Sequence, residues 1–178
     1  TAQDRLTELY LCGSQAEAGF VTCMLRFDNS GIQTAALPGQ IQAADGFGCI
    51  RVLEQAQLLG SYPVTASYRF DARQGAFARV SDYAVVRYAG DWEGRTLTVK
   101  RGGLPAFLLE NGVQSGPIAL AAGTELMLLE TDGQTYARLC RKDGALVMIL
   151  LEKTPEDARC AINGVWQDEW FDLPGAQD

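Results

Sequence analysis

The sequence contains no histidine, and this absence excludes more chemistry than any other feature of its composition. Without an imidazole the chain holds no Ser–His or Cys–His nucleophile pair, no His-ligated zinc and no imidazole acid–base group. Catalysis by this chain alone would therefore depend on carboxylates, lysine or tyrosine.

Long hydrophobic runs are also lacking. No apolar stretch approaches about 18 residues, so we expect no transmembrane segment. The sequence shows no signal peptide either, and it begins at Thr1. We expect a mature or trimmed form from which a targeting segment has been removed.

Closely spaced cysteines are absent, although five cysteines are present, at positions 12, 23, 49, 140 and 160. No C-x-x-C spacing occurs, so we predict no zinc or other metal site and no cofactor. Apolar neighbours in VTCML and ARLCR favour buried thiols that act as small hydrophobes. An odd count allows at most two disulfides, and a bridge between Cys140 and Cys160 would tie the last predicted helix to the strands before it.

Positive charge is scarce and scattered. The chain has 15 Lys and Arg against 22 Asp and Glu, a net charge of −7, and a pI near 4.6. Only Lys100-Arg101 and Arg141-Lys142 are adjacent basic pairs. Because phosphate binding needs clustered basic residues, nucleic acid is not an expected partner.

What the chain does contain is typical of a folded, β-rich protein: 47% hydrophobic and 21% charged residues. About ten short alternating runs, separated by turn residues every 8 to 12 positions, predict a sandwich or barrel. In the clearest early strand, 19–28, Val21, Cys23, Leu25 and Phe27 share one face by period two.

The stretch with the clearest pattern of strands and turns runs from Ile118 to Leu151. It predicts a three-stranded meander with turns at Asp132-Gly133 and Asp143-Gly144, because Gly tolerates positive φ and Asp accepts hydrogen bonds from the following backbone. The run ALVMILLE is apolar enough for a strand that is covered on both faces.

This stretch follows the order L-x-x-Gly-Thr-x-L-x-L-L-x-x-Asp-Gly-x-x-Tyr-x-x-(Val/Leu). The matching residues are Leu120, Gly123, Thr124, Leu126, Leu128, Leu129, Asp132, Gly133, Tyr136 and Leu139, with Asp143 and Gly144 after them. The order resembles bacterial SH3-type (SH3b) modules of cell-envelope proteins. The closing segment INGVWQDEWFDLPGA resembles the ends of uncharacterised proteins from anaerobic Gram-positive bacteria. The resemblance implies a small barrel used for binding rather than for chemistry.

The final segment changes character. Thr154-Pro155-Glu156-Asp157 predicts a helix start, with Thr as N-cap, Pro at the first position and acids near the positive end of the dipole. We predict that this short helix ends near Asn163-Gly164. The fold class we expect is all-β, with antiparallel meanders forming an SH3-like barrel or sandwich and one short C-terminal helix. We place a β-rich N-terminal region at 1–112 and an SH3-like region at 113–178, with one shared core as an alternative.

Two groups of residues are candidates for function. Trp92, Trp166 and Trp170 lie beside the acids Asp91, Glu93, Asp168 and Glu169, an arrangement that sugar and peptide sites use. The alternative for the tail aromatics is that they plug one end of a barrel. The acid pairs Asp91–Glu93 and Asp168–Glu169 are the only pairs we consider for glycoside hydrolysis, which needs two carboxylates across a cleft.

These features favour a non-catalytic binding module of an extracytoplasmic bacterial protein, secreted or anchored to the envelope, with envelope glycan, peptide or protein as partner. The location follows from the resemblance and from the β-rich, Gly-rich character. Two alternatives stay open: a calycin-like single barrel that carries a small apolar ligand, and a carboxylate-based glycoside hydrolase.

Overall fold

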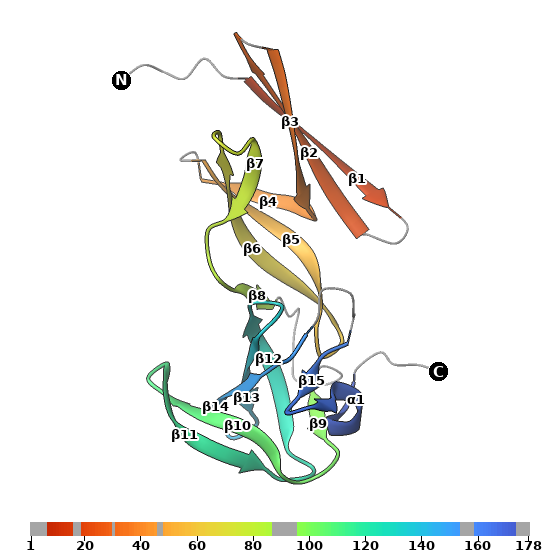
Figure 1. The fold of residues 1–178 in the computed structure, drawn as a ribbon, viewed down its shortest axis with the longest axis vertical. Coiled ribbons are helices and arrows are strands. Elements are labelled where there is room, and N and C mark those ends of the chain that lie inside the picture. The colour runs from red at the N-terminus through yellow and green to blue at the C-terminus, as the bar shows by residue number, and fades with distance from the viewer. Residues whose placement is uncertain are drawn as a thin grey trace. The chain divides into compact units, whose positions relative to one another are not determined.

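The computed structural model describes residues 7–15, 19–29, 31–45, 48–86, 96–153 and 159–173. Within these ranges the chain forms short β-strands and one helix of four residues, and the strand pairings defined there are antiparallel (Figure 1). The chain divides into an N-terminal unit, Thr1–Gln55 with Val64–Asp82, and a C-terminal unit, Ala56–Pro63 with Tyr83–Asp178. The all-β prediction with a short C-terminal helix is confirmed.

The N-terminal unit holds the first seven strands. They are β1 (Thr7–Gln15), β2 (Gly19–Asp28), β3 (Gly31–Pro38), β4 (Gln40–Ala44), β5 (Cys49–Gln57), β6 (Ser61–Asp71) and β7 (Ala76–Arg79). β1, β2 and β3 form a three-stranded meander, β4 pairs with β5, and β7 pairs with β6. The far end of the β5–β6 hairpin, Ala56–Pro63, belongs to the C-terminal unit.

The two faces of the three-stranded sheet differ in burial. Thr22 and Met24 of β2 and Leu37 of β3 are fully buried on one face. The opposite face carries the period-two set of β2, Val21, Cys23, Leu25 and Phe27, and is the more exposed one. Its neighbours Leu9, Leu11 and Ile32 are exposed as well, and Ile32 is 65% exposed. The sheet therefore presents an apolar outer face.

Gly39 forms the corner between β3 and β4. Its φ is +98°, and a Cβ atom at this position would lie 2.1 Å from the Leu53 carbonyl oxygen on the neighbouring strand. The Gly39 carbonyl accepts a hydrogen bond of 2.8 Å from the buried Thr22 hydroxyl. Only glycine combines this backbone conformation with so close an approach.

The C-terminal unit is built from ten further strands and the helix. They are β8 (Ala84–Val86), β9 (Leu97–Val99), β10 (Leu104–Glu110), β11 (Val113–Leu120), β12 (Glu125–Thr131), β13 (Tyr136–Arg141), β14 (Leu146–Leu150), β15 (Ala161–Ile162), β16 (Val165–Trp166), α1 (Gln167–Trp170) and β17 (Phe171–Asp172). The sheet order is β11-β10-β14-β13-β12, so β12, β13 and β14 form the predicted meander. The other edge of β12 pairs with β9 at one end and with β8 at the other.

The first and last strands of the stretch 97–172 lie side by side. β17 pairs with β9, with Phe171 opposite Val99. The core beneath them is apolar; its fully buried members include Leu97, Leu104, Leu126, Leu128, Leu139, Ile149, Ile162 and Phe171. Within the described ranges the strands form no closed barrel.

The turn between β12 and β13 is held by side-chain hydrogen bonds. Asp132 Oδ1 accepts from the backbone N–H groups of Gln134, Thr135 and Tyr136 at 2.9, 2.8 and 3.1 Å. Burial alone would raise the pKa of Asp132, but these bonds and the Thr135 hydroxyl outweigh it and lower the pKa below its ordinary value. The predicted role of Asp132 in this turn is confirmed.

One prediction about the C-terminal segment needs correction. We predicted a helix that starts at Thr154, continues through Ala161 and ends near Asn163-Gly164. Its start, 154–158, lies outside the described residues, whereas Ala161–Ile162 is strand β15. The helix that the structure describes is Gln167–Trp170. Asn163 and Gly164, with φ of 52° and 72°, form the two-residue turn between β15 and β16, because both left-handed positions suit a tight hairpin.

The division of the chain also differs from the predicted boundary at residue 112. The change of unit falls near Asp82, and the hairpin end Ala56–Pro63 joins the later unit. The sequence pattern did not reveal this because Val64–Asp82, which belong to the N-terminal unit, separate the hairpin end from the rest of its own unit along the chain.

Across the described ranges no helix has the length and apolar character needed to cross a bilayer.

Replacing Gly39 with alanine should destabilise the protein by more than about 2 kcal/mol, because the positive φ and the contact with the Leu53 carbonyl both penalise a Cβ atom. Urea denaturation followed by circular dichroism measures the loss. Gly13→Ala is the control, since a Cβ at Gly13 of β1 meets no atom within 4 Å. Its effect should stay within about 0.5 kcal/mol; equal losses for the two variants would contradict the account.

Candidate functional site

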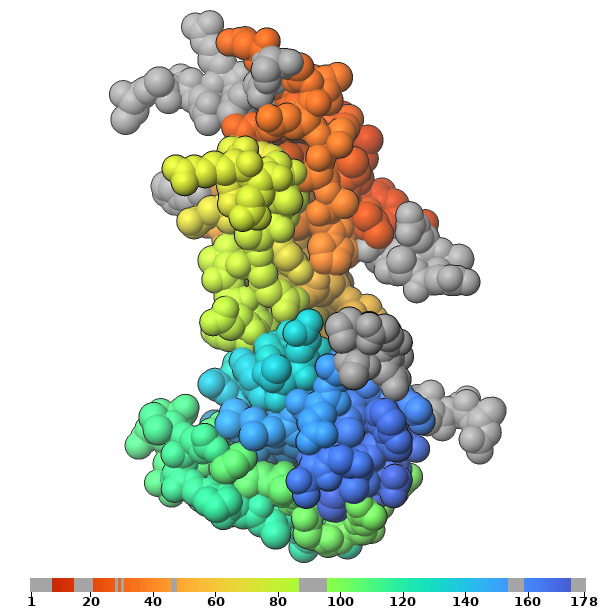
Figure 2. Space-filling model, viewed as in Figure 1, coloured from red at the N-terminus to blue at the C-terminus, as the bar shows by residue number. Residues whose placement is uncertain are grey.

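The C-terminal segment 159–173 lies at the surface of its unit (Figure 2, blue). The turn Asn163-Gly164 reverses the chain between β15 and β16, and α1 begins directly after Trp166. Trp166 is the N-cap residue, with extended backbone angles of −63° and 145°. The segment therefore changes from strand to helix at Trp166, and the helical turn that follows buries Gln167 and Trp170.

Gln167, the first residue of α1, is a buried polar side chain at 7% exposure. Its Oε1 accepts a hydrogen bond of 3.2 Å from the backbone N–H of Leu59 and one of 2.7 Å from the thiol of Cys160. Its own backbone N–H donates to the Cys160 carbonyl at 3.0 Å. One side chain thus joins the hairpin end Ala56–Pro63 to the C-terminal segment.

The hairpin end is itself buried in this unit. Leu58 and Leu59 are fully buried, and Leu59 has a φ of 52°, which is unfavourable for a bulky residue without glycine's freedom. Leu58 N–H donates to the Gly60 carbonyl at 2.9 Å, and Lys153 Nζ donates to the Gln57 carbonyl at 2.8 Å. Burial of two leucines and these bonds hold the strained turn in place.

Trp166 and Trp170 lie only four residues apart but in opposite environments. Trp170 is 6% exposed, and its indole N–H donates to the Ile162 carbonyl at 3.2 Å. Trp166 is 39% exposed, and the Arg159 guanidinium stacks over its ring at 4.5 Å from the centroid. Of these two rings, only that of Trp166 is available to a ligand at the surface.

Two basic side chains contact α1 and the strand β17 that follows it. Arg101 stacks on the Trp170 ring at 4.1 Å and lies 3.8 Å from the Glu169 carboxylate. Lys100 Nζ donates to the Asp168 carbonyl at 2.9 Å and pairs with Asp172 at 3.3 Å. We define the Trp166 surface as Arg101, Arg159, Trp166, Asp168 and Glu169. It combines an exposed aromatic ring with charges of both signs.

The predicted site is only partly located by the structure. Trp92, Asp91 and Glu93 lie outside the described residues. Trp170 is a core residue, and Trp166 lies at the surface. Asp168 and Glu169 are exposed on consecutive positions of α1. Consecutive helical positions point about 100° apart, so these two acids do not face each other across a cleft.

The predicted Cys140–Cys160 bridge is absent, because all five cysteines are free thiols. Cys140 is directed to the Arg141 carbonyl at 3.3 Å, whereas Cys160 donates to Gln167. Burial raises the pKa of the Cys160 thiol to about 11, so the thiol keeps its proton at neutral pH and can donate it. Among the described residues no group of three or more Cys, Asp or Glu is placed to hold a metal ion.

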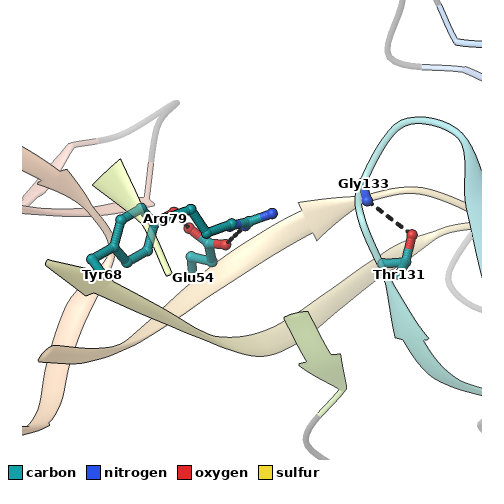
Figure 3. A network of polar contacts seen from close by, with 5 residues as sticks. All are labelled: Glu54, Tyr68, Arg79, Thr131 and Gly133. Carbon is teal, nitrogen blue, oxygen red and sulfur yellow. Dashed lines mark hydrogen bonds and ion pairs between the residues drawn. The ribbon is translucent and has the colours of Figure 1, made fainter. Parts of the chain in front are cut away.

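A second polar cluster lies in the N-terminal unit and was not predicted from the sequence. Figure 3 shows Glu54 of β5 between Tyr68 of β6 and Arg79 of β7. The Tyr68 hydroxyl donates to Glu54 Oε2 at 2.8 Å, Arg79 pairs with Glu54 Oε1, and the Arg79 guanidinium lies 5.8 Å from the Tyr68 ring centroid. Burial, together with the hydrogen bond to Glu54, raises the pKa of Tyr68 to about 12. No local pattern reveals this cluster, because its members come from three strands.

Figure 3 also shows the hydrogen bond of 2.9 Å from the Gly133 N–H to the Thr131 hydroxyl, which belongs to a turn of the C-terminal unit.

The chain matches no protein-family profile, no curated protein and no solved structure. Function must therefore be inferred from the geometry of its own residues.

Stability should fall as the pH rises from about 9 to about 11, because the folded state holds the Cys160 thiol protonated while the unfolded chain loses this proton near its ordinary pKa of 9. The contribution of this thiol to the free energy of unfolding is fully present below pH 9 and amounts to at most about 3 kcal/mol. The measurement is the free energy of unfolding against pH for wild type and Cys160→Ala.

Other groups titrate in the same range, so the difference between the two proteins carries the test. Cys160→Ala should be less stable at pH 7 but lose less stability on going to pH 11. Cys12→Ala, which removes an exposed thiol, serves as the control and should follow wild type. Parallel curves for wild type and Cys160→Ala would show that this thiol does not contribute.

Proposed function

We propose that the chain is a non-catalytic binding module of an extracytoplasmic bacterial protein, and that the Trp166 surface contacts a glycan or peptide of the cell envelope. The observation that carries the proposal is the exposure of Trp166. Trp166 is 39% exposed, whereas Trp170, four residues later, is buried. Arg159 stacks on the Trp166 ring, and an exposed ring beside a cation is suited to ligand contact.

The arrangement of strands supports an SH3-like module as the framework for this surface. The meander β12-β13-β14 follows the β10–β11 hairpin, and the short helix precedes β17, which pairs back to β9. Pairing of the first and last strands brings the two ends of the stretch together, which supports a compact module. The sequence resemblance to SH3b modules covers the same meander.

The described residues show no paired carboxylates across a cleft, which is consistent with a binding role. The sequence has no histidine, and Glu169 is paired with Arg101 at the surface rather than facing a second acid. A retaining or inverting hydrolase needs two carboxylates about 5 to 10 Å apart across a cleft. The exposed, consecutive Asp168 and Glu169 offer no such arrangement. A calycin-like carrier is not favoured either, since the described strands form no closed barrel to enclose a ligand.

Trp166→Ala should weaken binding of envelope fragments at least about tenfold, because it removes the exposed ring on which a sugar face or an apolar side chain would pack. Calorimetric titration with soluble peptidoglycan fragments that carry the glycan, the peptide or both measures the affinity. The control is Val113→Ala, which removes an exposed apolar side chain from β11 of the same unit.

Trp166→Phe keeps a ring and should retain part of the affinity, and circular dichroism verifies that each variant is folded. If wild type binds and Trp166→Ala binds equally well, the Trp166 surface is not the site. If wild type binds none of the fragments, the envelope ligand is wrong.

A further inference from the structure

The β6–β7 hairpin of the N-terminal unit carries an open groove of about 540 Å³. Arg69, Arg73 and Arg79 line it with the single acid Asp71, and the remaining lining comes from Phe70, Val80 and the small residues Ala72 and Ala78. The hairpin forms the yellow-green surface in Figure 2. Three arginines beside one acid are unusual in a chain whose net charge is −7.

The turn that carries Arg73 is fixed by its own hydrogen bonds. Asp71 Oδ1 accepts from the backbone N–H groups of Arg73 and Gln74 at 2.8 and 3.4 Å. The Gly75 N–H donates to the Asp71 carbonyl at 2.8 Å. The Asp71 carboxylate is therefore engaged in holding the turn, and Arg73 projects from a defined backbone.

Aromatic contacts join the two strands that carry the groove. Phe70 and Phe77 face each other across β6 and β7 with ring centroids 5.4 Å apart, and Arg26 lies over the Phe70 ring at 5.2 Å. Arg69 is directly opposite Ala78 in the register. Both residues line the groove, so the side chain opposite Arg69 in this strand pair is a small one.

The three arginines differ in their partners. Arg79 is already engaged by Glu54 and Tyr68 (Figure 3). Arg69 and Arg73 form no ion pair with any residue in the described ranges. Their guanidinium groups present planar sets of N–H donors that match the oxygens of a carboxylate or a phosphate.

We propose that this groove is an oxyanion-binding site, in which Arg69 and Arg73 bind a carboxylate or phosphate group of a ligand. Val80, which is 49% exposed, offers apolar contact to the part of the ligand next to the charged group. The site lies in the N-terminal unit and does not depend on the Trp166 surface, so each proposal can fail without the other.

The test is calorimetric titration at low ionic strength with two probes, inorganic pyrophosphate and the tricarboxylate tricarballylate. Wild type should bind at least one probe with a dissociation constant on the order of 1 mM. Preference for pyrophosphate would identify a phosphate-bearing natural ligand, and preference for tricarballylate a carboxylate-bearing one. Binding should weaken as salt is added, because the groove is open to solvent.

Arg69→Gln and Arg73→Gln should each raise the dissociation constant about fivefold or more. The matched control is Arg51→Gln, which removes an exposed arginine from β5 of the same unit and should leave binding within about twofold. The proposal is overturned if wild type binds neither probe at a probe concentration of about ten times the expected dissociation constant. So does equal weakening by Arg51→Gln, because the attraction would then come from net charge alone.

Discussion

The C-terminal unit depends on the side-chain oxygen of Gln167. This oxygen accepts a hydrogen bond from the Leu59 N–H and another from the Cys160 thiol, and it does so inside the core. A buried amide that lost these partners would be left unsatisfied at a cost of about 1 to 3 kcal/mol. The bond to Leu59 links residues 108 positions apart, so it fixes a long-range contact that no local interaction can replace.

The same interaction determines which aromatic residue reaches the surface. Gln167 anchors the start of α1, and the single helical turn that follows directs Trp170 inward to the Ile162 carbonyl. Trp166, just before the anchor, keeps its extended backbone and stays at the surface under Arg159. Burial of Gln167 and exposure of Trp166 are thus two consequences of one local geometry. The unfavourable φ of Leu59 is tolerated because Leu58 and Leu59 are completely buried beside this anchor.

Local chemistry was predictable from the sequence, and distant partners were not. The Asp132-Gly133 turn was predicted because its hydrogen bonds involve residues two to four positions away. Period two correctly put Val21, Cys23, Leu25 and Phe27 on one face of β2, but it cannot say which face is covered. Asn163-Gly164 was interpreted as the end of a helix through Ala161, whereas these residues form the turn of the β15–β16 hairpin, because a glycine after a left-handed residue suits both a helix end and a tight turn. The Glu54–Tyr68–Arg79 cluster and the contact of Leu59 with Gln167 join separate strands, so no sequence spacing indicated them.

Hydrogen exchange at the Leu59 amide tests this account most directly, because that N–H is the donor that joins the hairpin end to Gln167. In the intact chain we predict that Leu59 exchanges as slowly as the core amides of β12 and β13, and that Gln167→Ala accelerates it selectively. An amide that exchanges as fast as exposed turn positions in the wild-type protein would contradict the claim that Gln167 holds the hairpin end in the core.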